Sequence, residues 1–273
     1  MTMNIPRLRQ VALETRRKLL ESGPEETVNE RFVEYCRRCY RDGGGEIGIR
    51  PGELEALGWL YQFFVAGDKV RTVGKKVSAE DMPAATQLFT PRWIVEYLVE
   101  NSLGRLWMLN RPNSSLAESM AYYIDAEPPL DFPHLESPEQ IRICDPCCGS
   151  GNMLLYAYEL LDRIYRECGY GPEAIPGLII EHNLRGMDID RRAAELAVFI
   201  LEMKAGEGAP PPPPKITVPD ACCGVGSLMD TGERFEVVVT NPPFMGRRKM
   251  DPTLKKHILE CYPDSHADLF AVF

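Results

Sequence analysis

A short apolar segment that leads into a glycine turn and then into a long amphipathic pattern constrains the fold of this chain more than any other feature. Residues 141–144, Ile-Arg-Ile-Cys, are expected to form a buried strand, and the turn Asp-Pro-Cys-Cys-Gly-Ser-Gly follows at 145–151. From about residue 152 to 168, apolar residues recur at helical spacing. Strand, glycine turn and helix in this order predict an α/β fold with a mostly parallel sheet, whose ligands bind at the carboxyl ends of the strands.

The composition of the turn narrows the kind of ligand. The turn carries Gly149 and Gly151, whereas a dinucleotide fingerprint has three glycines and a P-loop continues with Lys and then Ser or Thr. It therefore favours a ligand without a pyrophosphate. The methionine part of S-adenosylmethionine fits, because glycines let the backbone approach it and Asp145 can interact with its ammonium group.

Carboxylates also follow the next two expected strands. Residues 184–188 form a strand pattern that ends on Asp188, where a carboxylate can bind the two hydroxyls of a ribose; a helix cap is the alternative. Residues 215–218 form another pattern, which ends at Asp220 and Ala221. Asp220 can accept from the amino group of an adenine ring while the Ala221 N–H donates to the ring, and an ordinary turn Asp is the equally weighted alternative.

Two residues stand at expected helix starts. Asp190 precedes a helical pattern at 191–204 and is assigned to capping, because negative charge suits a helix N-terminus. Thr90 precedes Pro91 and an amphipathic helix, and we expect Thr90 as its N-cap and Pro91 at the first helical position.

The tetrapeptide Asn241-Pro242-Pro243-Phe244 closes a β-rich run at 235–240 and carries most of the chemical information. The Asn side-chain oxygen and the carbonyl of the following Pro can both accept hydrogen bonds from the exocyclic amine of adenine, which favours a nitrogen whose lone pair can attack. Proline holds the loop rigid and adds no competing donor, and Phe244 offers a flat face for a base. The alternative is a strand followed by an ordinary Pro-Pro turn.

The order of these motifs resembles a known family. Thr-Pro-x-x-Ile-Val at 90, Asp-Pro-x-x-Gly-Ser-Gly at 145, the acids after the second and third strands, and Asn-Pro-Pro-Phe at 241 resemble the adenine-N6 DNA methyltransferases of the gamma arrangement, which include type IIG-like enzymes. The blocks at 57–64, 84–91, 100–107 and 145–151 are similar to the PglX-like methyltransferases of BREX phage-defence systems. This similarity covers most of residues 54–273.

The resemblance implies a Rossmann-like core that depends on S-adenosylmethionine, methyl transfer to adenine N6 in DNA, and a role in phage defence through BREX or restriction-modification. It implies double-stranded DNA and other BREX components as partners and a cytoplasmic location. The cofactor contacts it implies come from Thr90, Asp145, Cys147, Gly149, Gly151, Asp188, Asp220 and Ala221, and the catalytic target-base site from Asn241, Pro242, Pro243 and Phe244.

Two regions are expected. Residues 1–85 read as a small helical region, with helices near 7–21, 27–40 and 53–65, and residues 86–273 read as the methyltransferase core. A short helix near 116–124 is expected within a polar insertion. Because PglX-like proteins are far longer and 268–273 reads as the start of a helix after the fourth strand, we expect an incomplete core and a fragment.

Charge and cysteine usage constrain partners. The net charge is −9, whereas a DNA-binding surface is usually basic, so most DNA contacts are expected in a missing C-terminal part. Arg247-Arg248-Lys249, with Lys255 and Lys256, is a local exception that reads equally as a backbone contact and as a solvated loop. The nine cysteines accompany no signal peptide or membrane-length apolar run, so we expect reduced thiols, no metal and no membrane.

Two alternatives to the leading function remain. Asn-Pro-Pro-aromatic loops also serve methylation of other planar amines, such as a ribosomal guanine or a protein glutamine. A non-catalytic remnant that still binds S-adenosylmethionine is the other alternative.

Overall fold

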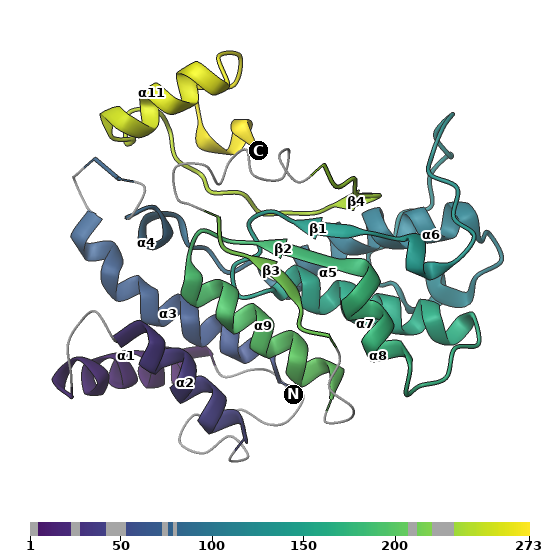
Figure 1. Ribbon diagram of the computed structural model, residues 1–273, viewed down its shortest axis with the longest axis horizontal. Coiled ribbons are helices and arrows are strands. Elements are labelled where there is room, and N and C mark those ends of the chain that lie inside the picture. The colour runs from purple at the N-terminus through teal and green to yellow at the C-terminus, as the bar shows by residue number, and fades with distance from the viewer. Residues whose placement is uncertain are drawn as a thin grey trace.

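A parallel β-sheet organises the described part of the chain (Figure 1). The computed structural model describes residues 5–22, 28–41, 53–72, 76–78, 81–206, 212–219 and 232–273. Within these ranges, four strands lie in the order β3-β2-β1-β4 and all pair in parallel. The strands are β1 (Ile143–Asp145), β2 (Leu184–Met187), β3 (Lys215–Thr217) and β4 (Val237–Val238).

The strand register explains which residues meet at the sheet edge. Ile143 lies opposite Leu184 of β2 and Val237 of β4, so the carboxyl ends of these strands coincide. All of β1 is buried, while β3 alternates between exposed and half-buried residues as an edge strand does. The expected strands are confirmed, although β4 is shorter than the predicted run at 235–240.

The helices in chain order are α1 (Ile5–Glu21), α2 (Val28–Arg41), α3 (Glu55–Thr72), α4 (Met82–Thr86), α5 (Arg92–Val99), α6 (Arg105–Asn110), α7 (Asn152–Glu167), α8 (Ile175–Leu178), α9 (Arg191–Ala205) and α11 (Pro252–Cys261). Two π-helical segments, η3 (Glu100–Gly104) and η6 (Ile179–Asn183), continue α5 and α8. Three 3₁₀ segments, η4 (Ser115–Ser119), η5 (Pro138–Gln140) and η7 (Leu269–Val272), complete the described helical elements. Among the described helices, none has the length and apolar character that crossing a membrane requires.

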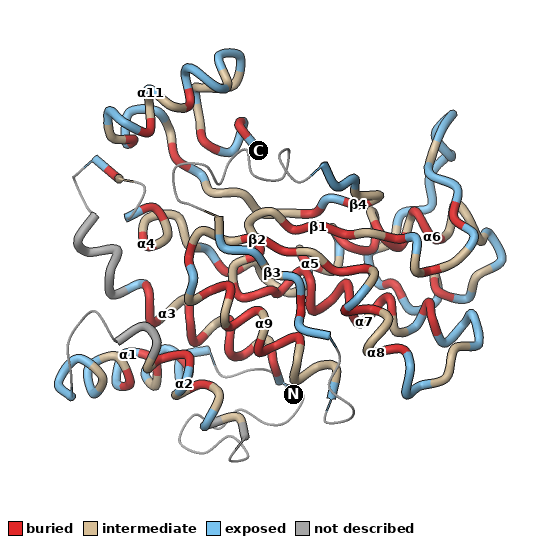
Figure 2. The backbone as a smooth tube through the Cα atoms, viewed as in Figure 1, coloured by how far each residue is buried: buried red, intermediate tan, exposed pale blue. Residues whose placement is uncertain are grey.

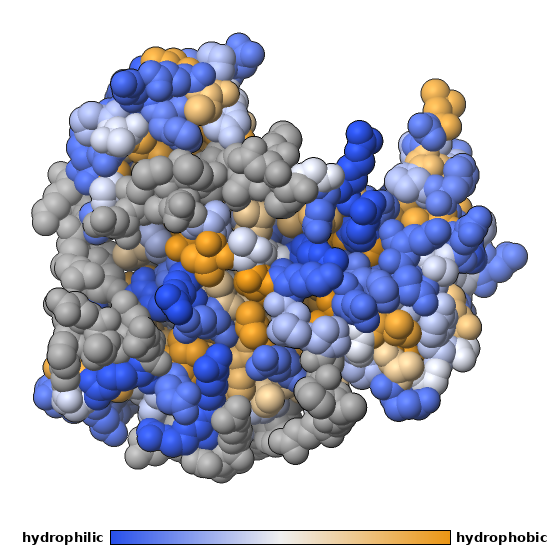
Figure 3. Space-filling view, in the orientation of Figure 1, coloured by the Kyte–Doolittle hydropathy of each residue, from blue (hydrophilic) through white to orange (hydrophobic). Residues whose placement is uncertain are grey.

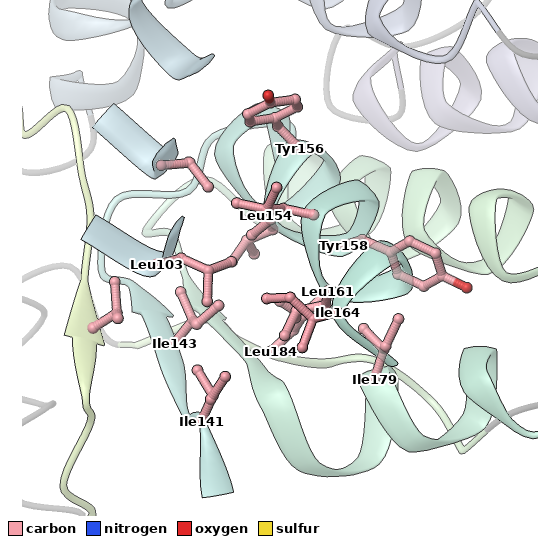
Figure 4. Packing of buried hydrophobic residues seen from close by; sticks show 14 of the residues in the cluster. Leu103, Ile141, Ile143, Leu154, Tyr156, Tyr158, Leu161, Ile164, Ile179 and Leu184 are labelled. Carbon is pink, nitrogen blue, oxygen red and sulfur yellow. The ribbon is translucent and has the colours of Figure 1, made fainter. Parts of the chain in front are cut away.

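The main core lies between α7 and the sheet. Figure 4 shows Leu154, Leu161 and Ile164 of α7 gathered against Ile143 of β1 and Leu184 of β2. These side chains are almost fully buried, and buried positions run along β1, β2, α7 and α9 (Figure 2). The apolar residues at helical spacing after the glycine turn therefore pack α7 on the sheet. This packing fixes the position of the turn at the end of β1.

A second core joins the N-terminal helices to the sheet layer through α9. Phe32 of α2 and Leu57 of α3 pack in one cluster with Leu196 and Phe199 of α9, while Ala197 of the same helix belongs to the main core. The three predicted N-terminal helices are confirmed. The boundary between residues 85 and 86 stays a prediction, with the qualification that α9 is shared by both cores.

The C-terminal part differs most from expectation. Residues 252–261 form α11, which was not predicted, although Asp251 caps it by accepting from the Leu254 N–H at 2.7 Å and Pro252 stands in its first turn. The helix expected from residue 268 is instead the 3₁₀ segment η7, and the helix expected near 116–124 is the 3₁₀ segment η4. Both segments are short pieces capped by a local side chain, Asp268 and Ser114 respectively.

Gly151 fixes the approach of α7 to α9. Its φ is +83°, a left-handed conformation that disfavours other residues, and a Cβ there would lie 3.0 Å from the Cβ of Ala197. We expect Gly151→Ala to lower the free energy of unfolding by about 3 kcal/mol or more, from backbone strain plus overpacking. Denaturation in urea measures this.

Gly169 supplies a matched control. Its φ is +84°, but a Cβ there meets nothing within 4 Å. Gly169→Ala should therefore cost only the backbone strain, about 1–2 kcal/mol. Equal costs at the two positions would contradict a packing role for Gly151.

Candidate functional site

A cavity of about 290 Å³ opens at the carboxyl ends of the strands. It is lined by residues from the segment before α5, the glycine turn, the turn after β2 and the loop after β4. The predicted site residues among them are Thr90, Asp145, Cys147, Gly149, Asp188, Asn241, Pro242, Pro243 and Phe244. The structure thus brings together four segments that are far apart in the sequence.

Among the described site residues, Gly151 does not line the cavity. Gly151 instead packs against Ala197, as described above. Asp220 and Ala221 lie outside the described residues. The roles of all three stay predictions.

Asp145 ends β1 as a buried carboxyl group. Its side chain belongs to a residue only 2% exposed, and Oδ1 accepts from the Cys147 N–H at 3.1 Å. Burial, with a smaller contribution from the nearby Asp188 carboxylate, raises the pKa of Asp145 to about 7. Among the described residues, no cation pairs with Asp145. A buried carboxyl without a protein cation suits a ligand that brings its own positive charge.

Asp188 connects the turn after β2 to the glycine turn. Its Oδ2 accepts from the Gly149 N–H at 2.8 Å, and its Oδ1 accepts from the Asp190 N–H at 2.8 Å. Burial raises the pKa of Asp188 to about 6 despite these bonds. Each oxygen retains acceptor capacity, so Asp188 can still receive hydrogen bonds from a ligand in the cavity.

Asp190, and not Asp188, is the N-cap of α9. Its side chain accepts from the Arg192 N–H at 3.0 Å and pairs with the Arg192 guanidinium at 2.8 Å, which confirms the predicted capping role. The buried Tyr61 hydroxyl of α3 also donates to Asp190. Burial raises the pKa of Tyr61, so the phenol stays protonated and can donate.

One face of α3 contacts the segments that line the cavity. Besides Tyr61, the Gln62 side-chain oxygen accepts from the Phe89 N–H. A Cβ at Gly58 would collide with the Phe89 ring and with Ser150 of the glycine turn. Sequence reasoning missed these contacts, although Gly58, Tyr61 and Gln62 have the i, i+3, i+4 spacing of a single helical face.

Thr90 does not cap α5. The helix begins at Arg92 with Pro91 in the N-cap position, and Pro91 is extended at ψ 145°, so Thr90 lies one residue too early. Its hydroxyl instead accepts from Asn241 Nδ2 at 3.1 Å. This bond holds the amide nitrogen of Asn241 on Thr90 and leaves Oδ1 as the atom that can accept from a ligand.

Asn152, the first residue of α7, holds the same segment and was not predicted. Its Nδ2 donates to the Thr90 carbonyl at 2.8 Å. Its Oδ1 is buried and, within the described part of the chain, has no hydrogen-bond partner. Because Asn152 lines the cavity, this unsatisfied acceptor is available to a polar ligand.

Phe244 presents an open aromatic face. The residue is 60% exposed, although it lines the cavity. Its ring centroid lies 5.5 Å from that of Phe270 of η7 at an interplanar angle of 36°, within the range of favourable aromatic pairs. Phe270 therefore supports Phe244 from one side, a contact that no local pattern in the sequence indicated.

Three cysteines at or beside the cavity are neutral thiols: Cys147 and Cys148 line it, whereas Cys144 lies in β1 and does not. Burial raises the pKa of Cys144 to about 12 and raises the pKa of Cys147 and Cys148 as well, with the neighbouring Asp145 carboxylate adding to each shift. A thiol whose pKa is raised in this way is a poor nucleophile. Cys147 and Cys148 therefore contribute shape to the cavity.

We expect the free energy of unfolding to fall as the pH rises from about 5 to about 7. The native pKa values, about 7 for Asp145 and about 6 for Asp188, exceed the value of about 3.9 for an exposed Asp. The native state therefore keeps protons that the unfolded chain loses. The resulting stability is complete below about pH 4 and is lost as the pH passes through the native pKa values, by about 1.4 kcal/mol per pH unit for each group.

Chemical denaturation across this range measures the effect. Asp145→Asn should remove the share of the slope that belongs to Asp145. Asp131→Asn, at an exposed position, removes one carboxylate elsewhere and should leave the slope unchanged. A free energy of unfolding that stays flat or rises over this range in the unaltered chain would contradict the assignment.

Comparisons with known proteins agree with this architecture. The chain is 48% identical to the adenine-specific methyltransferase BrxX of Escherichia coli O9:H4 (strain HS), across 56% of this chain and 13% of that protein. It is 30% identical to the adenine-specific methyltransferase PglX of Lacticaseibacillus casei (strain Zhang), across 81% of this chain and 26% of that protein. The resemblance to PglX-like proteins is thereby confirmed, and the chain spans only 13% and 26% of the length of these two relatives.

Among solved structures, the type IIL restriction-modification enzyme MmeI in complex with DNA superimposes with a TM-score of 0.51 at 20% identity, covering 83% of this chain and 31% of that chain. This likeness supports the fold, a Rossmann-like methyltransferase sheet with flanking helices. The model of the N-6 DNA Methylase family matches residues 130–270, more than half of the 273 residues. The chain therefore belongs to the N-6 DNA Methylase family.

Proposed function

We propose that this chain forms the cofactor-binding and target-base part of an enzyme that methylates adenine N6 in DNA, within a BREX or restriction-modification defence system. The observation that carries the proposal is the shared cavity. It joins two carboxyl groups, the buried Asp145 and the half-buried Asp188, to the loop Asn241-Pro-Pro-Phe. Membership of the N-6 DNA Methylase family supports the same reaction.

The residues present fit S-adenosylmethionine. Asp145 would hold its ammonium group and Asp188 its ribose hydroxyls, while Gly149, at φ +54°, lets the turn approach the ligand. The buried Asn152 Oδ1, without a hydrogen-bond partner in the described residues, is one more acceptor on the cavity wall. When bound, S-adenosylmethionine supplies an electrophilic methyl group on its sulfonium.

The loop after β4 fits an adenine amine. Asn241 Oδ1 and the Pro242 carbonyl are proposed to accept from that amine, which makes its lone pair available. Thr90 fixes the Asn241 amide so that the oxygen is the free acceptor. The exposed face of Phe244 is proposed to stack on the base, which must leave the DNA helix to reach the cavity.

The experiment is transfer of a tritiated methyl group from S-adenosylmethionine to unmethylated DNA by the full-length parent protein. Asn241→Ala should lower the rate about 100-fold or more, because the acceptor acts on the reacting amine, while S-adenosylmethionine still binds. Asn113→Ala, an exposed Asn outside the cavity, is the matched control and should retain activity. Methylation of RNA or of a protein in place of DNA would reject the proposal, as would full activity of Asn241→Ala.

A second prediction tests how Asn241 is held. Thr90→Val keeps the shape of the side chain and removes the hydroxyl that accepts from Asn241 Nδ2. We expect kcat to fall about tenfold, the equivalent of one hydrogen bond of about 1.4 kcal/mol, with little change in the KM for DNA. Thr90→Ser keeps the hydroxyl and should keep most of the activity. Equal kcat values for the two variants would show that Thr90 does not orient Asn241.

A further inference from the structure

A cluster of uncompensated positive charge follows the Asn-Pro-Pro-Phe loop. It consists of Arg247, Arg248 and Lys249 in a turn and Lys255 on α11, hereafter the four-cation cluster. In the part of the chain that the structure describes, no carboxylate forms an ion pair with any of these four. The cluster is a local concentration of positive charge on a chain whose net charge is −9.

Some cations elsewhere in the core are paired with carboxylates of the protein. The Arg92 guanidinium lies 2.7 Å from Glu96 and 2.8 Å from Glu159, and the Lys204 ammonium lies 2.8 Å from Glu159. Those pairs satisfy charge inside the fold. The four-cation cluster has no such structural use and is available to an external anion.

The four cations border one hollow. They line a depression of about 610 Å³ together with His266 and Ala267. The lobe that carries α11, at the upper left in Figure 3, presents mostly hydrophilic side chains on the face shown. Several cations around one concave surface attract a polyanion more strongly than a single exposed cation does.

The backbone under the cluster is braced. The Arg247 N–H donates to the Ala267 carbonyl at 3.1 Å, and the Val77 N–H donates to the Lys249 carbonyl at 2.8 Å. The Lys76 ammonium donates to the Arg248 carbonyl. Beneath the turn, Met250 belongs to a buried apolar cluster with Val77, Leu254 and Leu269. The bases of the cationic side chains are therefore fixed, which lowers the entropy cost of binding.

The hollow lies next to the proposed target-base pocket. Gly246 is two residues beyond Phe244, and the Met245 N–H between them donates to Asp268 Oδ1 at 3.1 Å. A base stacked on Phe244 therefore has its own sugar and phosphates beside this turn. Duplex DNA carries about one negative charge per 1.7 Å of helix axis, so adjacent phosphates would meet several of the cations at once.

We propose that the four-cation cluster binds the phosphodiester backbone of the DNA strand that carries the target adenine. This inference rests on the proposed function and adds to it a contact that fixes the strand while its base occupies the cavity. Phosphate contacts of this kind position a strand without reading its sequence.

The test uses the full-length parent protein with Arg247→Gln and Arg248→Gln combined. Binding to a duplex is measured by fluorescence anisotropy over a range of salt concentrations. Affinity should fall about tenfold or more, and the slope of log K against log salt should become shallower by about 1 to 2, since each phosphate contact contributes about 0.9. The combined Arg247→Lys and Arg248→Lys variant should keep the slope.

The matched control combines Arg9→Gln and Arg17→Gln on exposed positions of α1, which removes the same charge far from the hollow. Its affinity and slope should equal those of the unaltered protein. Unchanged thermal unfolding and S-adenosylmethionine binding in every variant establish that the fold is intact.

Three outcomes would overturn the proposal. One is an unaltered slope in the Gln variant, and another is an equal loss in the α1 control. The third is loss of binding to anionic phospholipid vesicles in the Gln variant while DNA binding is kept, which would assign the cluster to a membrane surface. Failure here is separable from failure of the proposed function, because methyl transfer to DNA is scored independently of the salt slope.

Discussion

Two carboxyl groups at adjacent strand ends, one buried and one half-buried, are the constraint on which the rest of this structure depends. Asp145 and Asp188 lie in the same cavity, each bonded to backbone N–H groups of the turns around it. Burial raises the pKa of both, because a charged carboxylate without a cation is unfavourable there. The burial of these groups thus lowers the stability of the native state, and a cationic ligand with hydroxyl donors would offset that cost.

Long-range polar contacts hold this arrangement in place. Tyr61 of α3 reaches Asp190, which in turn donates its N–H to Asp188. Asn152 of α7 holds Thr90, and Thr90 holds Asn241. The bonds of Tyr61 to Asp190, Asn152 to Thr90 and Asn241 to Thr90 join segments that are far apart in the sequence, whereas the Asp190–Asp188 bond lies within one turn. The geometry of the cavity therefore depends on the cores on both sides of α9. Helix α3 in this sense supports the site through its contacts with Asp190 and Phe89, without lining the cavity itself.

Local patterns in the sequence were sufficient for the sheet and for most of the cavity. The strand, turn and helix in residues 141–168 could be predicted from the spacing of apolar residues and from Gly149. Both signals depend only on residues that are close together in the sequence. The rest depends on tertiary contacts. Thr90 was misassigned as a cap because Pro91 delays the helix by one residue, and Asn152 and Phe270 act only through partners far along the chain. Residues 251–252, Asp-Pro, are a typical helix start, and α11 does begin there. The helix was not predicted because the cations on either side of these residues were interpreted as part of a solvated loop.

The most direct test of the account is a crystal structure of the chain with S-adenosylhomocysteine. The account predicts the amino group of that ligand at Asp145, its ribose hydroxyls on Asp188, and its sulfur facing the loop of Asn241 and Phe244. A ligand bound outside this cavity, or one whose ribose makes no contact with Asp188, would contradict the account.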